Sequence, residues 1–143
     1  DKLGLFGEDK NDKKLINNLF NWMEKNKVDY TNTFCHLMEV NIENSAYKDD
    51  DFIRWLNEWK KRSELNNSNK EKQIKLMKKN NPIVIPRNHK VEEALAGANK
   101  GSLEKMDKLT AILKNPYSDQ KDIIEYQLPA PKSDEKYQTF CGT

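Results

Sequence analysis

The chain has 143 residues, a length that usually forms one domain and is too short for a complete large enzyme. Its 25 Lys and Arg residues nearly balance its 23 Asp and Glu residues, which argues against a protein that coats nucleic acid through bulk positive charge. The mean hydropathy is −1.00 and no apolar run approaches the ~18 residues of a membrane helix, so we expect neither nucleic acid nor a membrane as a partner.

The composition favours helices around a thin core. Hydrophobic residues make up 36 % of the sequence and charged residues 34 %, while five Gly and five Pro leave few turns for a sheet. The two cysteines, Cys35 and Cys141, are too few for a zinc site or a disulfide framework and indicate a reducing, cytoplasmic compartment. The sequence begins at Asp1 rather than at a Met, so we expect a piece of a longer chain.

Three amphipathic helices are predicted in the first half of the chain. The first spans Asp9–Lys27, the second follows the capping residue Asp29, and the third begins at Asp49–Asp51 and runs to about Leu65. The inward residues expected in the first helix are Leu15, Ile16, Leu19, Phe20 and Met23, with Trp22 at the edge of the stripe. Those expected in the next two are Phe34, Leu37, Met38 and Ile42, then Phe52, Ile53, Leu56 and Trp59 with Trp55 adjacent.

A short fourth helix is expected after a capping box formed by Ser68 and Glu71. The sequence Asn81-Pro82 ends it. Pro82 and Pro86 flank three β-branched residues, a pattern that predicts an extended, buried crossing segment over 81–88.

Two further helices and an irregular tail complete the prediction. Asn88 is the expected cap of the fifth helix, Gly101 lies in its stop region, and Ser102 opens a sixth helix that ends before Pro116. The inward residues expected are Val91, Ala94, Leu95 and Ala98, then Leu103, Met106, Leu109 and Leu113. We therefore predict an all-α fold of about six short helices in an irregular bundle. Residues 1–116 are expected to be helical, and residues 117–143 to form a tail with one helical turn near Asp122–Tyr126. The whole of 1–143 is expected to form a single module.

Few residues carry recognisable chemistry. Asp49–Asp51 could be a metal site, but adjacent carboxylates diverge around a helix start, so we prefer a capping role. The basic clusters Lys60–Arg62 and Lys70–Lys79 lie beside tryptophans, as on a single-strand-binding face, yet interspersed glutamates make a solvated helix surface the better explanation. His36 and His89 have no partners at metal spacing and are taken as structural.

Cys141 is the one candidate functional side chain. It is third from the end of the sequence, where a thiol can be accessible and redox-active if its thiolate is stabilised. On residue chemistry alone an inert cysteine is the simpler interpretation. Cys35, on the flank of the second helix, is interpreted as a core residue.

Several stretches together resemble the C-terminal third of the selenoprotein O family of kinase-like protein adenylyltransferases. They occur in the family's order along nearly the whole chain and include a form of the 81–95 segment that is similar to the low-GC Gram-positive branch. The stretches are Lys2-Leu3-Gly4-Leu5, Asp29-Tyr30-Thr31 with Phe34, the helix ending at Trp59 and Arg62, Asn81-Pro82 through Arg87-Asn88, Asn115-Pro116-Tyr117, and Cys141-Gly142-Thr143.

The resemblance implies a parent enzyme with a protein-kinase-like fold. Such an enzyme binds ATP with Mg²⁺ or Mn²⁺ and transfers AMP to Ser, Thr or Tyr hydroxyls of protein substrates. The family's catalytic, ATP-binding and metal-binding residues lie upstream of the matched region, so none is assigned to this chain. Cys141 matches the near-terminal position that holds selenocysteine or cysteine in the family, and this likeness makes a redox or disulfide-regulating thiol the preferred interpretation.

Two hypotheses follow. The first is a C-terminal structural and redox-regulatory module that is inactive alone and packs on the missing N-terminal kinase-like region of a bacterial cytoplasmic enzyme. The alternative is a free-standing helical protein-interaction module with no enzymatic parent. The sequence upstream of Asp1 distinguishes them.

Overall fold

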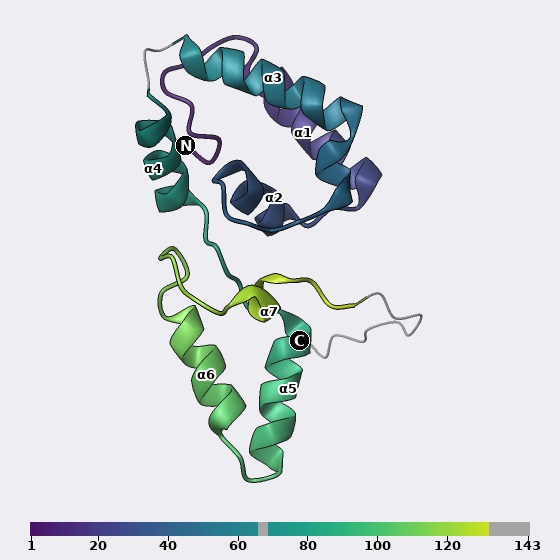
Figure 1. Ribbon diagram of the computed structural model, residues 1–143, viewed down its shortest axis with the longest axis vertical. Coiled ribbons are helices and arrows are strands. Elements are labelled where there is room, and N and C mark those ends of the chain that lie inside the picture. The colour runs from purple at the N-terminus through teal and green to yellow at the C-terminus, as the bar shows by residue number, and fades with distance from the viewer. Residues whose placement is uncertain (66–68, 132–143) are drawn as a thin grey trace. The chain divides into compact units, whose positions relative to one another are not determined.

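A computed structural model describes residues 1–65 and 69–131 (Figure 1). All regular structure in these residues is helical, which confirms the predicted all-α fold class. The chain divides into two compact units, Asp1–Ile83 and Val84–Thr143. Within the described residues, no helix combines the length and apolar character needed to cross a lipid bilayer.

The first unit holds the helices predicted before the Asn-Pro segment. The predicted cap Asp29 is confirmed, because its carboxylate accepts a hydrogen bond from the Asn32 backbone N–H at 2.8 Å. The elements are α1 (Asp12–Asn26), α2 (Tyr30–Leu37), the 3₁₀ turn η1 (Ser45–Lys48), α3 (Asp50–Glu64) and α4 (Lys70–Asn80).

The core of the first unit is aromatic, and two inward residues differ from the prediction. In α1, Trp22 is buried and Phe20 is 42 % exposed. In α3, Trp55 is buried and Ile53 is 43 % exposed. The larger indole rings take the central positions because each removes more apolar surface from water than the smaller neighbour would.

Two element boundaries in this unit also differ. The second helix was expected to continue to Ile42, but α2 ends at Leu37, and Glu39 then adopts a left-handed backbone with φ of 63°. Ile42 is still buried, although outside the helix. At α4 the cap is Asn69, whose side chain accepts from the Lys72 backbone N–H, while the predicted cap Ser68 lies outside the described residues.

The predicted extended segment after α4 is confirmed. Asn81 and Ile83 in this segment are buried, and the backbone is non-helical until α5. Proline at positions 82 and 86 prevents the helix from continuing.

The second unit is a helical hairpin with a short third helix. Its elements are α5 (Asn88–Asn99), α6 (Glu104–Leu113) and α7 (Ile124–Gln127). After α5 the Ser102 N–H bonds the Gly97 carbonyl and the Gly101 N–H bonds the Ala98 carbonyl, with Gly101 at φ 86°. This pair of bonds is a Schellman stop, so the predicted role of Gly101 is confirmed.

Some predicted details of this unit are wrong. Asn88 is the first helical residue rather than the cap, which is Arg87 and makes no side-chain capping bond. Leu95 and Leu103 are exposed instead of inward, and Ile112 is buried. α6 begins at Glu104 rather than at Ser102.

The segment after Pro116 packs as far as α7. The Lys90 and Lys108 ammonium groups each lie 5.4 Å from the Tyr126 ring centroid and also contact the Glu125 carboxylate, at 3.1 and 3.3 Å. These two contacts hold the pKa of Glu125 below its usual value. Arg87 donates to the Gln127 carbonyl at 2.7 Å. The helical turn predicted near Asp122–Tyr126 is therefore present and is held by α5 and α6.

Candidate functional site

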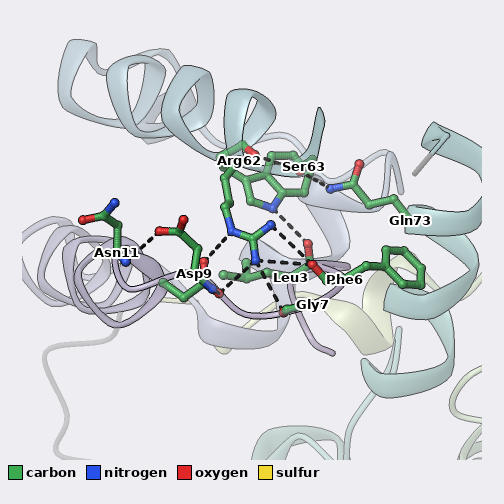
Figure 2. A network of polar contacts seen from close by, with 10 residues as sticks. Leu3, Phe6, Gly7, Asp9, Asn11, Arg62, Ser63 and Gln73 are labelled. Atoms are coloured by element: carbon green, nitrogen blue, oxygen red, sulfur yellow. Dashed lines mark hydrogen bonds and ion pairs between the residues drawn. The ribbon is translucent and has the colours of Figure 1, made fainter. Parts of the chain in front are cut away.

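The most connected polar site in the first unit surrounds the non-helical segment before α1. Side chains of α3 donate hydrogen bonds to its backbone carbonyl groups (Figure 2). The side chain of Asn81, the residue after α4, donates to another of them. We call this set the N-terminal anchor, and it consists of Lys2, Leu3, Gly4, Phe6, Gly7, Asp12, Trp59, Arg62, Ser63, Gln73 and Asn81.

Arg62 is the central charge of the N-terminal anchor. Its Nε lies 2.6 Å from one Asp12 carboxylate oxygen and its Nη2 lies 3.0 Å from the other, a bidentate pair. The same guanidinium donates to the Phe6 carbonyl at 3.3 Å and to the Gly7 carbonyl at 3.4 Å. One side chain therefore connects α3, the start of α1 and the N-terminal segment.

Burial makes the Arg62–Asp12 pair electrostatically strong. The Arg62 side chain is 8 % exposed and that of Asp12 23 %. The hydrogen bond from Arg62 lowers the pKa of Asp12, although partial burial opposes the shift. The hydrogen bond to Asp12 raises the pKa of Arg62. Both groups therefore stay ionised at neutral pH, and the charge of each is compensated inside the fold.

Trp59 and Ser63 extend the N-terminal anchor from α3 to α4. The Trp59 indole N–H donates to the Leu3 carbonyl at 2.9 Å. One turn on, the Ser63 hydroxyl donates to the Trp59 carbonyl at 2.8 Å and accepts from the Gln73 amide at 2.7 Å. Figure 2 shows Ser63 and Gln73 meeting between their helices.

Asn81 closes the anchor on the other side. Its buried side-chain amide donates to the Lys2 carbonyl at 2.8 Å and to the Met77 carbonyl at 2.9 Å. The Lys2 ammonium in turn donates to the Asn80 carbonyl at 2.9 Å. The end of α4 and the N-terminal segment are therefore joined by reciprocal bonds.

Gly4 permits this close packing. Its φ of 65° lies in the left-handed region, and a Cβ built there would be 2.5 Å from the Gln73 Cγ and 2.8 Å from the Met77 Cγ. Only a residue without a side chain fits between the segment and α4.

Chemically, the N-terminal anchor positions a chain segment. Its donors are used on backbone carbonyl groups, on Asp12 and on the Ser63 hydroxyl, and it holds no nucleophile paired with a base. No three His, Cys, Asp or Glu side chains group to hold a metal within residues 1–65 and 69–131. The donor groups in that part of the chain do not fit a Mg²⁺ or Mn²⁺ site.

The two cysteines differ in what the structure says of them. Cys141, the candidate redox residue, lies outside the described residues. Cys35 is fully buried, and its Sγ lies 3.8 Å from the carbonyl oxygens of Pro82 and Ile83. The prediction that Cys35 is a core residue is therefore confirmed.

His36 is packed against an aromatic ring. It stacks on Tyr47 with ring centroids 4.0 Å apart, and burial lowers its pKa. A lowered pKa keeps the imidazole neutral at pH 7. The contact agrees with a structural role for His36.

The aspartates before α3 are placed as expected but bond differently. Asp49 is the N-cap residue, yet its carboxylate makes no capping bond and instead accepts from the Trp22 indole at 2.8 Å. Asp51, in the first turn, pairs with Lys25 at 3.0 Å and with Arg54. Their position suits the positive end of the helix dipole, while the predicted capping bond itself is absent.

The alternative of a single-strand-binding face lacks exposed tryptophans. Trp55 and Trp59 are buried and donate to the carbonyl groups of Leu15 and Leu3, so neither indole is available to stack on a base. Arg62, from the basic cluster, is already paired with Asp12.

A groove in the first unit was not predicted. It has a volume of about 1120 Å³ and is lined by His36, Tyr47 and Trp59 among others. Its rim carries both signs of charge, from Lys48, Lys60 and Lys70 and from Glu39, Glu43 and Glu64. This mixture does not select an anion or a cation.

Comparison with known proteins gives a consistent result. The family described as Protein adenylyltransferase SelO matches residues 1–114. A Protein nucleotidyltransferase YdiU from Pelagibacter ubique (strain HTCC1062) is 55 % identical over 144 residues, covering 100 % of this chain and 30 % of that protein. Proteins of the same name from Bacillus mycoides (strain KBAB4) and Bacillus thuringiensis (strain Al Hakam) are each 45 % identical, covering 99 % of this chain and 30 % of their own length.

The chain thus spans about 30 % of the length of the curated relatives it matches. Identity is higher to the Pelagibacter relative than to either Bacillus relative, so these comparisons give no preference to the Gram-positive branch expected from the sequence. The N-terminal anchor joins three of the six stretches that carried the resemblance, namely Lys2–Leu5, Trp59 with Arg62, and Asn81–Pro82.

Proposed function

Because this chain belongs to the SelO family of protein adenylyltransferases, we propose that it is the C-terminal part of an enzyme that transfers AMP from ATP to Ser, Thr or Tyr hydroxyls of other proteins. The observation that carries the proposal is the 55 % identity over 100 % of this chain to a nucleotidyltransferase of which the chain covers 30 %. A relative so much longer favours this proposal over a free-standing helical interaction module.

In that enzyme this chain has a supporting role. ATP with Mg²⁺ or Mn²⁺ would bind residues of the N-terminal kinase-like region, which also carries the catalytic groups. The N-terminal anchor supports this assignment, because Trp59, Arg62 and Asn81 donate hydrogen bonds to backbone carbonyl groups of the segment that leads into α1. The segment where the preceding region joins is thereby held in one conformation.

The test uses the full-length protein and this chain side by side. With ATP and Mn²⁺ or Mg²⁺, we expect the full-length protein to add AMP to protein hydroxyls, detected as a mass increase on substrate peptides. We expect no ATP binding by this chain in calorimetry. Failure of the full-length protein to transfer AMP would overturn the proposed activity, and ATP binding by this chain would overturn the assignment of the nucleotide site.

We further propose a redox role for Cys141 in the bacterial cytoplasm, on the family likeness alone. A partner thiol would have to come from outside this chain, because Cys35 is fully buried. The test replaces Cys141 with Ser in the full-length protein and compares AMP transfer with and without reductant. The same reductant response in both forms would remove the redox role.

A further inference from the structure

Two aromatic side chains form an exposed patch on the first unit. Phe20 of α1 and Tyr30 of α2 are 42 % and 46 % exposed, and their ring centroids are 6.0 Å apart. They line a shallow hollow of about 580 Å³. We call this hollow the aromatic patch, and it consists of Phe20, Met23, Glu24, Lys27, Val28 and Tyr30.

Such a surface is typical of an interface. Neighbouring aromatic rings in a largely apolar hollow leave a continuous surface that water solvates poorly, and aromatic side chains are enriched at the centres of protein interfaces. Ile53, on α3 of the same unit, is 43 % exposed but does not line this hollow, and scattered exposed side chains of that kind are ordinary.

The aromatic patch lies close to the start of the N-terminal segment. The Tyr30 ring contacts the buried Phe34 ring, with centroids 4.9 Å apart. The Lys2 ammonium lies over the same Phe34 ring, 5.8 Å from its centroid. Residues preceding Asp1 could therefore reach Phe20 and Tyr30 over a span that about seven extended residues cover.

We propose that the region preceding Asp1 in the full-length protein packs on the aromatic patch. This inference rests on the proposed function, which places this chain after an N-terminal region that makes up the greater part of its relatives. The N-terminal anchor fixes the point of entry, and the patch supplies apolar area next to it. Together they hold that region to the first unit at two adjacent places.

The experiment measures solvent access in the full-length protein. Phe20→Cys, Tyr30→Cys and the control Ile53→Cys are each labelled with a maleimide, and the rate is read at the variant peptide by mass spectrometry. Phe20 and Ile53 are equally exposed within this chain. We expect labelling at positions 20 and 30 to be roughly tenfold slower than at position 53 in the native protein, and equal in guanidinium.

The outcomes are distinct. Equal native rates at all three positions would overturn the proposal. Protection that disappears on dilution would also overturn it, because the cover would then be a second copy. Labelling needs neither ATP nor substrate. The labelling rates therefore test the packing even if the full-length protein fails to transfer AMP, and the two failures can be told apart.

Discussion

The Arg62 guanidinium of α3 and the Asp12 carboxylate at the start of α1 meet at 2.6 and 3.0 Å, fifty residues apart in sequence. Because Arg62 also reaches the Phe6 and Gly7 carbonyl groups, this pair couples the stability of the helices to the position of the N-terminal segment. All three tryptophans, Trp22, Trp55 and Trp59, belong to the first unit, so tryptophan fluorescence reports its unfolding alone.

Arg62→Lys is expected to destabilise the first unit. Lysine keeps the charge but cannot supply the planar fork that bonds both Asp12 oxygens and the two carbonyl groups. We expect a loss of about 2–3 kcal/mol in the free energy of unfolding, measured by urea titration with tryptophan fluorescence. Arg54→Lys is the control, since Arg54 pairs with Asp51 on the exposed surface, and its midpoint should not move. Equal midpoints for the two variants would contradict the role given to Arg62.

The pair also predicts an acid dependence. The pKa of Asp12 is held below the ordinary value of 3.8 by the Arg62 hydrogen bond, so the pair stabilises the fold above that value. This stabilisation is lost as the pH falls through the lower pKa of the folded state. Urea midpoints of wild type and Asp12→Asn should differ by a constant amount from about pH 5 to 7 and converge below about pH 4. A difference that stays constant into acid would contradict the assignment.

His36 is separated from this effect by its own pH window. Burial lowers the pKa of His36 from the ordinary 6.5, so the contribution of the neutral imidazole to the free energy of unfolding begins to fall as the pH drops below that value. Comparing His36→Gln with the double variant His36→Gln, Asp12→Asn therefore isolates the pH dependence that comes from Asp12.

Local signals in the sequence predicted the helices well. Asp29 offers a capping carboxylate and Gly101 a left-handed stop, and both act within a few residues of their own position. The inward faces were harder to predict. Phe20 and Trp22 lie on different sides of α1, so only one of them can face the core. Which one does so depends on the contact with Phe52, whose ring centroid lies 4.4 Å from that of Trp22.

The N-terminal anchor could not be predicted from spacing. Trp59 and Leu3 are 56 positions apart, and the acceptor is a backbone carbonyl that every residue carries. The same is true of the bond from Asn81 to the Lys2 carbonyl, which joins residues 79 positions apart. The family likeness marked these stretches, but only the fold brings them together.

Asn81→Ala is expected to loosen the end of α4 from the N-terminal segment. The change leaves the part-buried Lys2 carbonyl without its side-chain amide donor, while the Met77 carbonyl keeps only the Asn81 backbone N–H at 2.8 Å. We expect a cost of about 2–3 kcal/mol in urea unfolding. Asn80→Ala is the matched control, because the Asn80 side chain donates to the Leu76 carbonyl within α4, at 2.8 Å, and its loss should cost about 1 kcal/mol or less. An equal cost for both would remove the bridging role of Asn81.

Gly4→Ala separates close packing from backbone strain. Both Gly4 and Gly101 have left-handed φ, of 65° and 86°, so alanine at either position costs about 1 kcal/mol of strain. A Cβ at Gly101 meets nothing within 4 Å, whereas at Gly4 it would lie 2.8 Å from the Gln73 backbone oxygen, which cannot rotate away.

Displacing that contact requires the N-terminal segment to move from α4. Gly4→Ala should therefore cost about 1–3 kcal/mol more than Gly101→Ala in the free energy of unfolding. Gly4→Ala is measured by tryptophan fluorescence, which reports the first unit. Gly101→Ala is measured by loss of helical circular dichroism after the transition seen in fluorescence is subtracted, because helices of both units contribute to that signal. Since the moved segment carries the Leu3 carbonyl away from the Trp59 indole, Gly4→Ala should also shift the tryptophan emission to longer wavelength in the native state. An unchanged spectrum with equal costs would show that the segment does not pack on α4.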